Sequence, residues 1–132
     1  MPSKGQVLQA IGMLYEHCQE KTNAEPDDIS GICDGNFPED KVPLKEYTCC
    51  VLDMLRVMNG DKFEPDEALD NLKDLPDRVK KHLMEGINQC RNSGKNGSTC
   101  AETAYEVVKC FKATLGKYFF FPCGTDELPP EE

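Results

Sequence analysis

Residues 43–55 read PLKEYTCCVLDML, and this stretch decides the fold because it joins a helical pattern to two adjacent cysteines. Pro43 pre-sets the backbone for a first helical turn, and apolar side chains then recur along one helix face. Neighbouring side chains on a helix diverge by about 100°, so Cys49 and Cys50 cannot bond to each other. They must reach two different partners, and we therefore expect a helix that is cross-linked from two sides.

Six further cysteines bring the total to eight in 132 residues. Such a density is typical of secreted proteins, because the cytosol keeps thiols reduced. A cytosolic protein with free or metal-bound thiols is the alternative, but zinc sites favour closely paired cysteines and no C-x-x-C motif occurs. We therefore expect disulfides, a secreted protein and no metal ion. Spacing alone does not select one set of pairs.

The excess of acidic residues excludes some classes of binding partner. The 24 acidic residues outnumber the 15 basic ones, and the net charge of −9 argues against nucleic acids and anionic membrane surfaces as partners. No apolar run approaches the roughly 20 residues that span a bilayer, so we expect no membrane insertion. Residues 1–5 contain no apolar stretch of signal-peptide length, and we expect a mature chain. Its length predicts a single domain over residues 1–132, with an extended segment over 117–132.

Helical spacing covers most of the chain, which predicts an all-α fold. We expect about six short helices near residues 7–18, 26–33, 43–58, 65–75, 76–90 and 99–115. The NGD sequence at 59–61 ends the third of these, and Thr99 with Glu102 forms a capping box at the start of the sixth. Strand propensity is weak outside the aromatic run at 118–121.

The cysteine spacing resembles that of the insect odorant-binding proteins, the pheromone and general odorant-binding family. Matches to the family's first, third, fourth, fifth and sixth cysteines are Cys18, Cys50, Cys90, Cys100 and Cys110. The flanking sequences GNFPED at 35–40 and CAETAY at 100–105 are similar too. The resemblance covers roughly residues 10–115 and implies six short helices around a central hydrophobic cavity.

Two features depart from the family pattern and indicate a divergent, eight-cysteine member, such as one from a non-insect arthropod. Glu46 stands where the second cysteine belongs, and Cys33 and Cys123 have no counterpart. The family pairs its first cysteine with its third, its second with its fifth and its fourth with its sixth. With Cys49 in the missing role, the resemblance implies Cys18–Cys50, Cys90–Cys110, Cys49–Cys100 and Cys33–Cys123. A Cys33–Cys49 or a Cys100–Cys123 cross-link is the alternative that would contradict the last two.

The implied cavity would hold small hydrophobic molecules, and large apolar side chains on inward helix faces are its candidate lining. Methionines adapt to ligands of varied shape, although each of these residues would also fit an ordinary core. The candidate ligand-binding residues are Ile11, Tyr15, Met54, Leu55, Met58, Leu83, Met84, Ile87, Val108 and Phe111. Tyr118, Phe119 and Phe120 join them, because in the family the segment after the last helix contributes to the pocket wall. A strand-like segment packed on the core surface is the alternative.

The sequence also suggests roles for a histidine and for a possible glycosylation site. His82 follows Arg78, Lys80 and Lys81, so we expect it on a solvent-exposed helix face, with pH-gated ligand release as the alternative. The NGS sequence at 96–98 is an N-glycosylation sequon in a polar loop.

Together these features predict an extracellular carrier of odorants, pheromones or lipid-like ligands. The resemblance implies a chemosensory receptor as a further partner, and we expect a monomer or a weak homodimer. No G-x-S-x-G or H-E-x-x-H motif is present, so we expect no catalytic residue, no cofactor and no enzyme. A secreted interaction or sequestering protein of the salivary or venom type is the first alternative. A lipolytic enzyme is the second, but it needs a histidine base that the sequence after Cys50 lacks.

Overall fold

The structure is a computed structural model that describes residues 3–125 and 127–130, and helices make up most of it. The N-terminal half contains α1 (Lys4–Thr22), α2 (Pro26–Cys33) and α3 (Val42–Met54). A short antiparallel hairpin, β1 (Met58–Asn59) and β2 (Lys62–Phe63), follows them. The C-terminal half contains α4 (Pro65–Asn71), α5 (Asp77–Gln89), α6 (Cys100–Leu115) and the 3-10 turn η1 (Gly116–Tyr118). The prediction of an all-α fold is confirmed.

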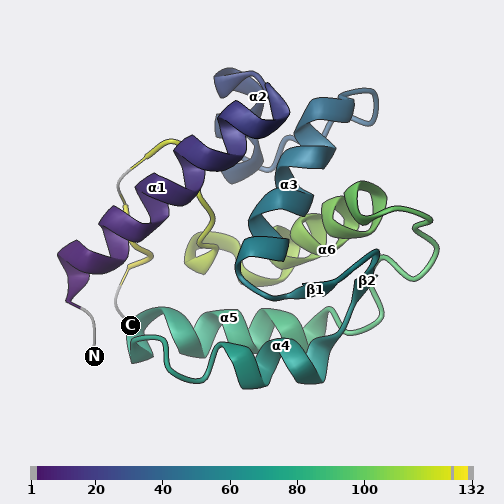
Figure 1. Ribbon diagram of the computed structural model, residues 1–132. Helices are drawn as coiled ribbons and strands as arrows, with labels where there is room; N and C mark the ends of the chain where they lie inside the picture. The colour runs from purple at the N-terminus through teal and green to yellow at the C-terminus, as the bar shows by residue number, and fades with distance from the viewer. Residues whose placement is uncertain (1–2, 126, 131–132) are drawn as a thin grey trace.

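Helix α6 lies at the centre, packed against α3 on one side and α5 on the other. In Figure 1 α1, α2 and α3 form the upper part of the molecule, and α4 and α5 run side by side below. Helices α3 and α6 contribute many of the fully buried side chains, among them Tyr47, Val51, Tyr105 and Val108. Within the described residues, no helix is both long and apolar enough to cross a bilayer.

Four disulfides join these elements, and all eight cysteines lie within the described residues. They tie α1 to α3, α3 to the start of α6, the end of α5 to α6, and the end of α2 to the C-terminal segment. The pairs are Cys18–Cys50, Cys49–Cys100, Cys90–Cys110 and Cys33–Cys123. These are the four pairs that the family resemblance implies. As the adjacent cysteines require, α3 is held on two sides by different partners.

Helix α1 extends beyond the expected range, from Lys4 to Thr22, whereas α3 and α4 end earlier than expected. Helix α3 ends at Met54 instead of near residue 58, because Arg56 adopts a positive φ of 61° and the chain turns into the hairpin. The NGD sequence therefore forms the hairpin turn, where Gly60 takes a φ of 60°. Helix α4 ends at Asn71, so the leucines at 72 and 75 lie in the connection to α5.

The expected capping box at the start of α6 is half formed. The Thr99 hydroxyl accepts the Glu102 N–H at 3.2 Å. The Glu102 carboxylate, however, accepts a hydrogen bond from Lys45 Nζ at 3.3 Å instead of turning back to the cap. A complete capping box forms at α1, between Ser3 and Gln6.

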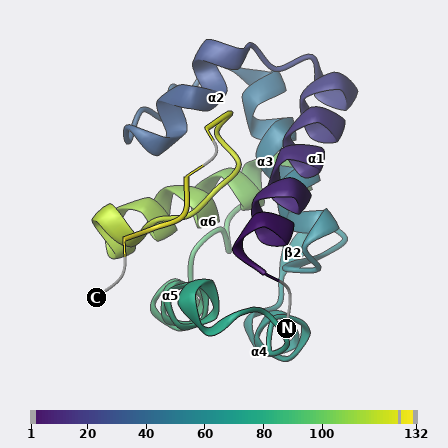
Figure 2. The ribbon, with the colours of Figure 1, turned by 90° about the vertical axis from the view of Figure 1, so that its left-hand side faces the viewer.

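Residues 119–123, called the strap here, follow η1 and run back along the molecule. Figure 2 shows this segment leaving the end of α6, rising beside α2 and turning back. The strap forms no strand, although the aromatic run within it has strand propensity. The strands that the structure describes are the two of the hairpin at 58–63. Cys123 ties the strap to the end of α2.

Candidate ligand-binding site

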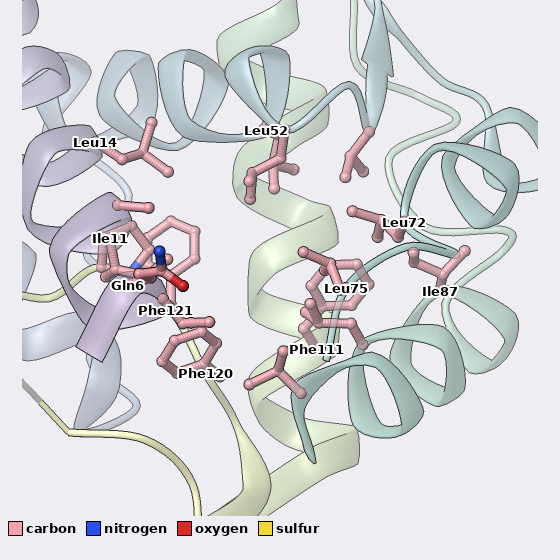
Figure 3. Close-up of a pocket in the computed structure, with 17 residues that line it drawn as sticks. Gln6, Ile11, Leu14, Leu52, Leu72, Leu75, Ile87, Phe111, Phe120 and Phe121 are labelled. Atoms are coloured by element: carbon pink, nitrogen blue, oxygen red, sulfur yellow. The ribbon is translucent and has the colours of Figure 1, made fainter. Parts of the chain in front are cut away.

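A cavity of about 210 Å³ lies between α1, the end of α3, α5, α6 and the strap. Figure 3 shows its lining side chains converging from these elements. Seventeen residues line it: Gln6, Val7, Ala10, Ile11, Leu14, Leu52, Leu55, Val57, Leu72, Leu75, Val79, Leu83, Ile87, Phe111, Phe120, Phe121 and Pro122. Such an apolar hollow with few polar groups is the usual form of a small-molecule site.

Helix periodicity explains how α1 and α5 supply two of the walls. Val7, Ile11 and Leu14 fall on one face of α1, and Cys18 continues that face into its disulfide with Cys50 of α3. On α5, the residues at 79, 83 and 87 recur every fourth position and form the opposite wall. The Cys90–Cys110 disulfide fixes the end of α5 to α6. Two cross-links thus hold helices that border the cavity.

The strap forms a third wall, and its position is determined by three contacts. The Tyr47 hydroxyl donates a buried hydrogen bond of 2.6 Å to the Pro122 carbonyl. The Phe121 ring packs edge-to-face on Tyr47, with ring centroids 6.1 Å apart. The Cys33–Cys123 disulfide then fixes the end of the strap. These contacts hold Phe120, Phe121 and Pro122 against the cavity.

Gln6 alone among the described lining residues carries a polar side chain. Its Oε1 atom already accepts the Ser3 N–H at 2.7 Å in the capping box that opens α1. The amide Nε2, which can donate two hydrogen bonds, remains for a guest in the cavity. Gln6 is exposed, which places this donor at the solvent side of the cavity.

Two buried tyrosines have hydroxyl groups that stay protonated and are already used. Burial, and secondarily the neighbouring Tyr15, raises the pKa of Tyr47 far above its ordinary value. Burial, and then the carboxylate of Glu39, likewise raises the pKa of Tyr105. The Tyr105 hydroxyl donates to the Pro38 carbonyl at 2.6 Å, so its proton is engaged within the protein.

Six of the thirteen predicted ligand-binding residues line the cavity. They are Ile11, Leu55, Leu83, Ile87, Phe111 and Phe120. They come from α1, α5, α6, the residue after α3 and the strap, so the sequence pattern identifies a member of each of these walls.

The predicted methionines lie outside the cavity lining. Met54, expected on an inward face, is 53% exposed, because α3 ends there and Leu52 and Leu55 face the cavity instead. Met58 is buried in β1, where it pairs with Phe63 across the hairpin. Met84 is half-buried on α5, next to the lining residue Leu83.

The other predicted aromatic and aliphatic residues pack around the cavity. Val108 is fully buried in the core of α6. Tyr15 packs edge-to-face on Tyr47, with ring centroids 6.2 Å apart. Phe119 stacks beside Phe121, and Lys112 Nζ lies 5.4 Å from the centre of its ring. They therefore support the walls from outside.

His82 is buried, which corrects its expected place on a solvent-exposed face. It is 6% exposed, and its ring stacks on Tyr118 with centroids 4.4 Å apart. The basic neighbours in sequence are misleading, because His82 shares the buried face of α5 with Val79 and Gly86. The stack places η1, and with it the start of the strap, against α5.

Eleven lining residues were not among the candidates. Helical phase would have found Val7 and Leu14, which share a face with Ile11, and Val79, which shares one with Leu83. The remaining eight are Gln6, Ala10, Leu52, Val57, Leu72, Leu75, Phe121 and Pro122. Their places depend on how the helices and strap meet, which no local pattern indicates.

Comparison with known proteins gives consistent matches. The sequence profile of the PBP/GOBP family matches residues 2–114. General odorant-binding protein 69a of Drosophila melanogaster is 27% identical over 115 residues, which is 86% of this chain and 74% of that protein.

Solved structures resemble the fold as well. Odorant binding protein 5 of Apis mellifera has a TM-score of 0.79 and 26% identity, covering 91% of this chain and 98% of its own. Odorant binding protein 7 of Anopheles gambiae has a TM-score of 0.60 and 25% identity, covering 79% of this chain and 81% of its own. The latter has four disulfide bridges and was solved in complex with an azo compound.

Proposed function

Because the chain belongs to the PBP/GOBP family of odorant-binding proteins, we propose that it is an extracellular carrier whose ligand occupies the cavity between α1, α5 and the strap. The family membership makes it a carrier of small ligands. Our proposal adds to this that the ligand binds in the cavity, that the protein is secreted and that the ligand is of a particular chemical kind.

One observation carries the proposal: a cavity of about 210 Å³ whose described lining is apolar apart from Gln6. Removing apolar surface from water stabilises a complex by roughly 25 cal/mol per Å². A hydrocarbon ligand gains this favourable free energy at nearly every wall of the cavity. The disulfides keep the walls in place without a guest, so less ordering free energy is lost on binding.

The lining also favours a particular ligand chemistry. None of the described lining residues is charged, so a carboxylate or an ammonium group would lose its hydration without gaining a partner. The Gln6 Nε2 group offers hydrogen-bond donors at the solvent side. We therefore expect a neutral, mostly hydrocarbon ligand with one acceptor oxygen, such as an ester, ketone or aldehyde, directed toward Gln6.

Within this proposal the predicted residues divide into two groups. The six that line the cavity contact the ligand: Ile11, Leu55, Leu83, Ile87, Phe111 and Phe120. Those outside it, such as Tyr15 and Val108, hold the walls in position.

Four disulfides and the absence of free thiols support an oxidising, extracellular location. In that location a monomer or a weak dimer would take up sparingly soluble molecules and present them to a chemosensory receptor.

Displacement of an apolar fluorescent probe tests the proposal. A neutral ester with an alkyl chain should displace the probe from the purified protein at one equivalent, whereas the matching carboxylate should displace it far less. If neutral apolar compounds never displace the probe, or if the carboxylate competes equally well, the assignment of this cavity is wrong.

A further inference from the structure

The connection between α5 and α6 contains a tight turn with two outward-facing residues. The Gly97 N–H donates to the Gly94 carbonyl at 3.0 Å, which closes a β-turn over Lys95 and Asn96. Both central residues are exposed. The amide of Asn96 therefore lies at the tip of a surface loop.

Two glycines hold this turn against α6. Gly94 has a φ of 75°, and a Cβ atom there would lie 2.8 Å from the Thr103 carbonyl oxygen. A Cβ atom on Gly97 would lie 2.8 Å from the Thr103 backbone nitrogen. Larger residues at either position would push the turn off the helix. The close packing of both ends leaves the tip residues directed away from the protein.

The tip residue begins the sequon Asn96-Gly97-Ser98, and Ser98 is exposed too. Beside it lies a shallow polar hollow of about 330 Å³ that Asn92, Glu102 and Glu106 help to line. Sugar hydroxyl groups are donors, and the carboxylates and the Asn92 amide carry acceptor oxygens that suit them. Sequence motif, exposure and neighbouring surface thus agree.

We propose that Asn96 carries an N-linked glycan whose first sugar lies over this polar hollow. The proposal rests on the secreted state proposed above, because the modification occurs in the secretory pathway. The co-substrate is a lipid pyrophosphate-linked oligosaccharide. Asn96 Nδ2 forms a bond to the anomeric carbon, the bond from that carbon to the pyrophosphate oxygen breaks, the lipid pyrophosphate leaves, and the amide proton passes to a base.

The glycan would lie away from the ligand cavity. In Figure 1 the α5–α6 connection is on the right, whereas the start of α1, with Gln6, is on the left. Figure 2 agrees, since α1 and the strap face the viewer and that connection lies behind. No residue of the turn lines the cavity. A glycan at Asn96 should therefore cover one end of the protein and leave ligand entry open.

The test is expression of the full chain behind a secretory leader in eukaryotic cells, followed by intact mass measurement before and after peptide N-glycosidase. Wild type should lose a glycan mass and gain Asp at position 96. Both Asn96→Gln and Ser98→Ala should be secreted without the glycan. Lys95→Gln, which changes the neighbouring tip residue and keeps the sequon, should remain glycosylated.

Apolar-probe binding by the same samples separates this proposal from the ligand assignment. Glycosylated wild type and Asn96→Gln should bind the probe with equal affinity. Secreted wild type that binds the probe but shows no glycan mass would overturn the proposed modification and leave the carrier function intact. Glycan on Asn96→Gln would equally overturn the assignment to this residue.

Discussion

At the scale of single residues, the proposed function predicts that Gln6 distinguishes a ligand with an acceptor oxygen from a plain hydrocarbon. Gln6→Leu should lower the affinity for an alkyl ester roughly two- to fivefold, as for the loss of one hydrogen bond, and leave alkane affinity unchanged or higher. Gln9→Leu is the matched control, because Gln9 is exposed on the same helix and does not line the cavity. Displacement titrations with the ester and the alkane measure the difference, and an unchanged preference in Gln6→Leu would remove Gln6 from the site.

Tyr47 makes stability depend on alkaline pH. Burial raises its pKa, so the folded state keeps this proton where the unfolded chain, with a pKa near 10, loses it. The contribution of Tyr47 to the free energy of unfolding should therefore be constant below about pH 10 and fall as the pH rises further.

Tyr47→Phe provides the matching variant. It removes the hydrogen bond to the Pro122 carbonyl and should cost about 1–3 kcal/mol at neutral pH, because that buried acceptor loses its partner. Above pH 10 its stability should fall less steeply than that of wild type. Urea unfolding between pH 7 and 11 measures both effects, and parallel curves for the two proteins would show that Tyr47 is not the group responsible.

At the scale of elements, the strap is a wall of the cavity that a disulfide holds in place. Removing that disulfide with Cys33→Ala and Cys123→Ala should lower apolar-probe affinity roughly tenfold or more, because Phe120 and Phe121 would leave the cavity. The double variant Cys49→Ala and Cys100→Ala is the control, since that cross-link joins α3 to α6 and lines no part of the cavity.

The free energy of unfolding should fall by a similar amount in both double variants, about 2–5 kcal/mol. Urea unfolding together with probe titration separates the two effects. Equal loss of affinity in the two variants would mean that affinity follows general stability, and the strap would then have no specific role.

Element boundaries also explain where sequence-based prediction of the site succeeded and failed. The phase of α1 and α5 is regular, so Ile11, Leu83 and Ile87 were found from spacing. Helical spacing predicts a third helix that continues to residue 58, whereas the structure ends it at Met54 and places Met58 in a strand of the hairpin. The helix ends early because Arg56 has a positive φ, a backbone conformation that the residue type does not reveal.

At the scale of the whole molecule, helical periodicity was sufficient for the all-α fold, and family resemblance implied the four cross-links that the structure contains. The cavity itself was harder to predict. Its walls come from segments far apart in the sequence, and residues such as Ala10 and Pro122 line it because the strap runs back along the cavity. Local patterns carry no information on that passage.

Apolar-probe titration of two tryptophan variants tests the central claim, the location of the ligand, most directly. Leu83→Trp places a large side chain in the cavity. Met54→Trp places the same side chain on the protein surface, because Met54 is exposed although its sequence position predicted an inward face. With folding checked by urea unfolding, Leu83→Trp should bind the probe roughly tenfold or more weakly and Met54→Trp should bind it like wild type. Wild-type affinity in a folded Leu83→Trp, or a loss confined to Met54→Trp, would contradict the account.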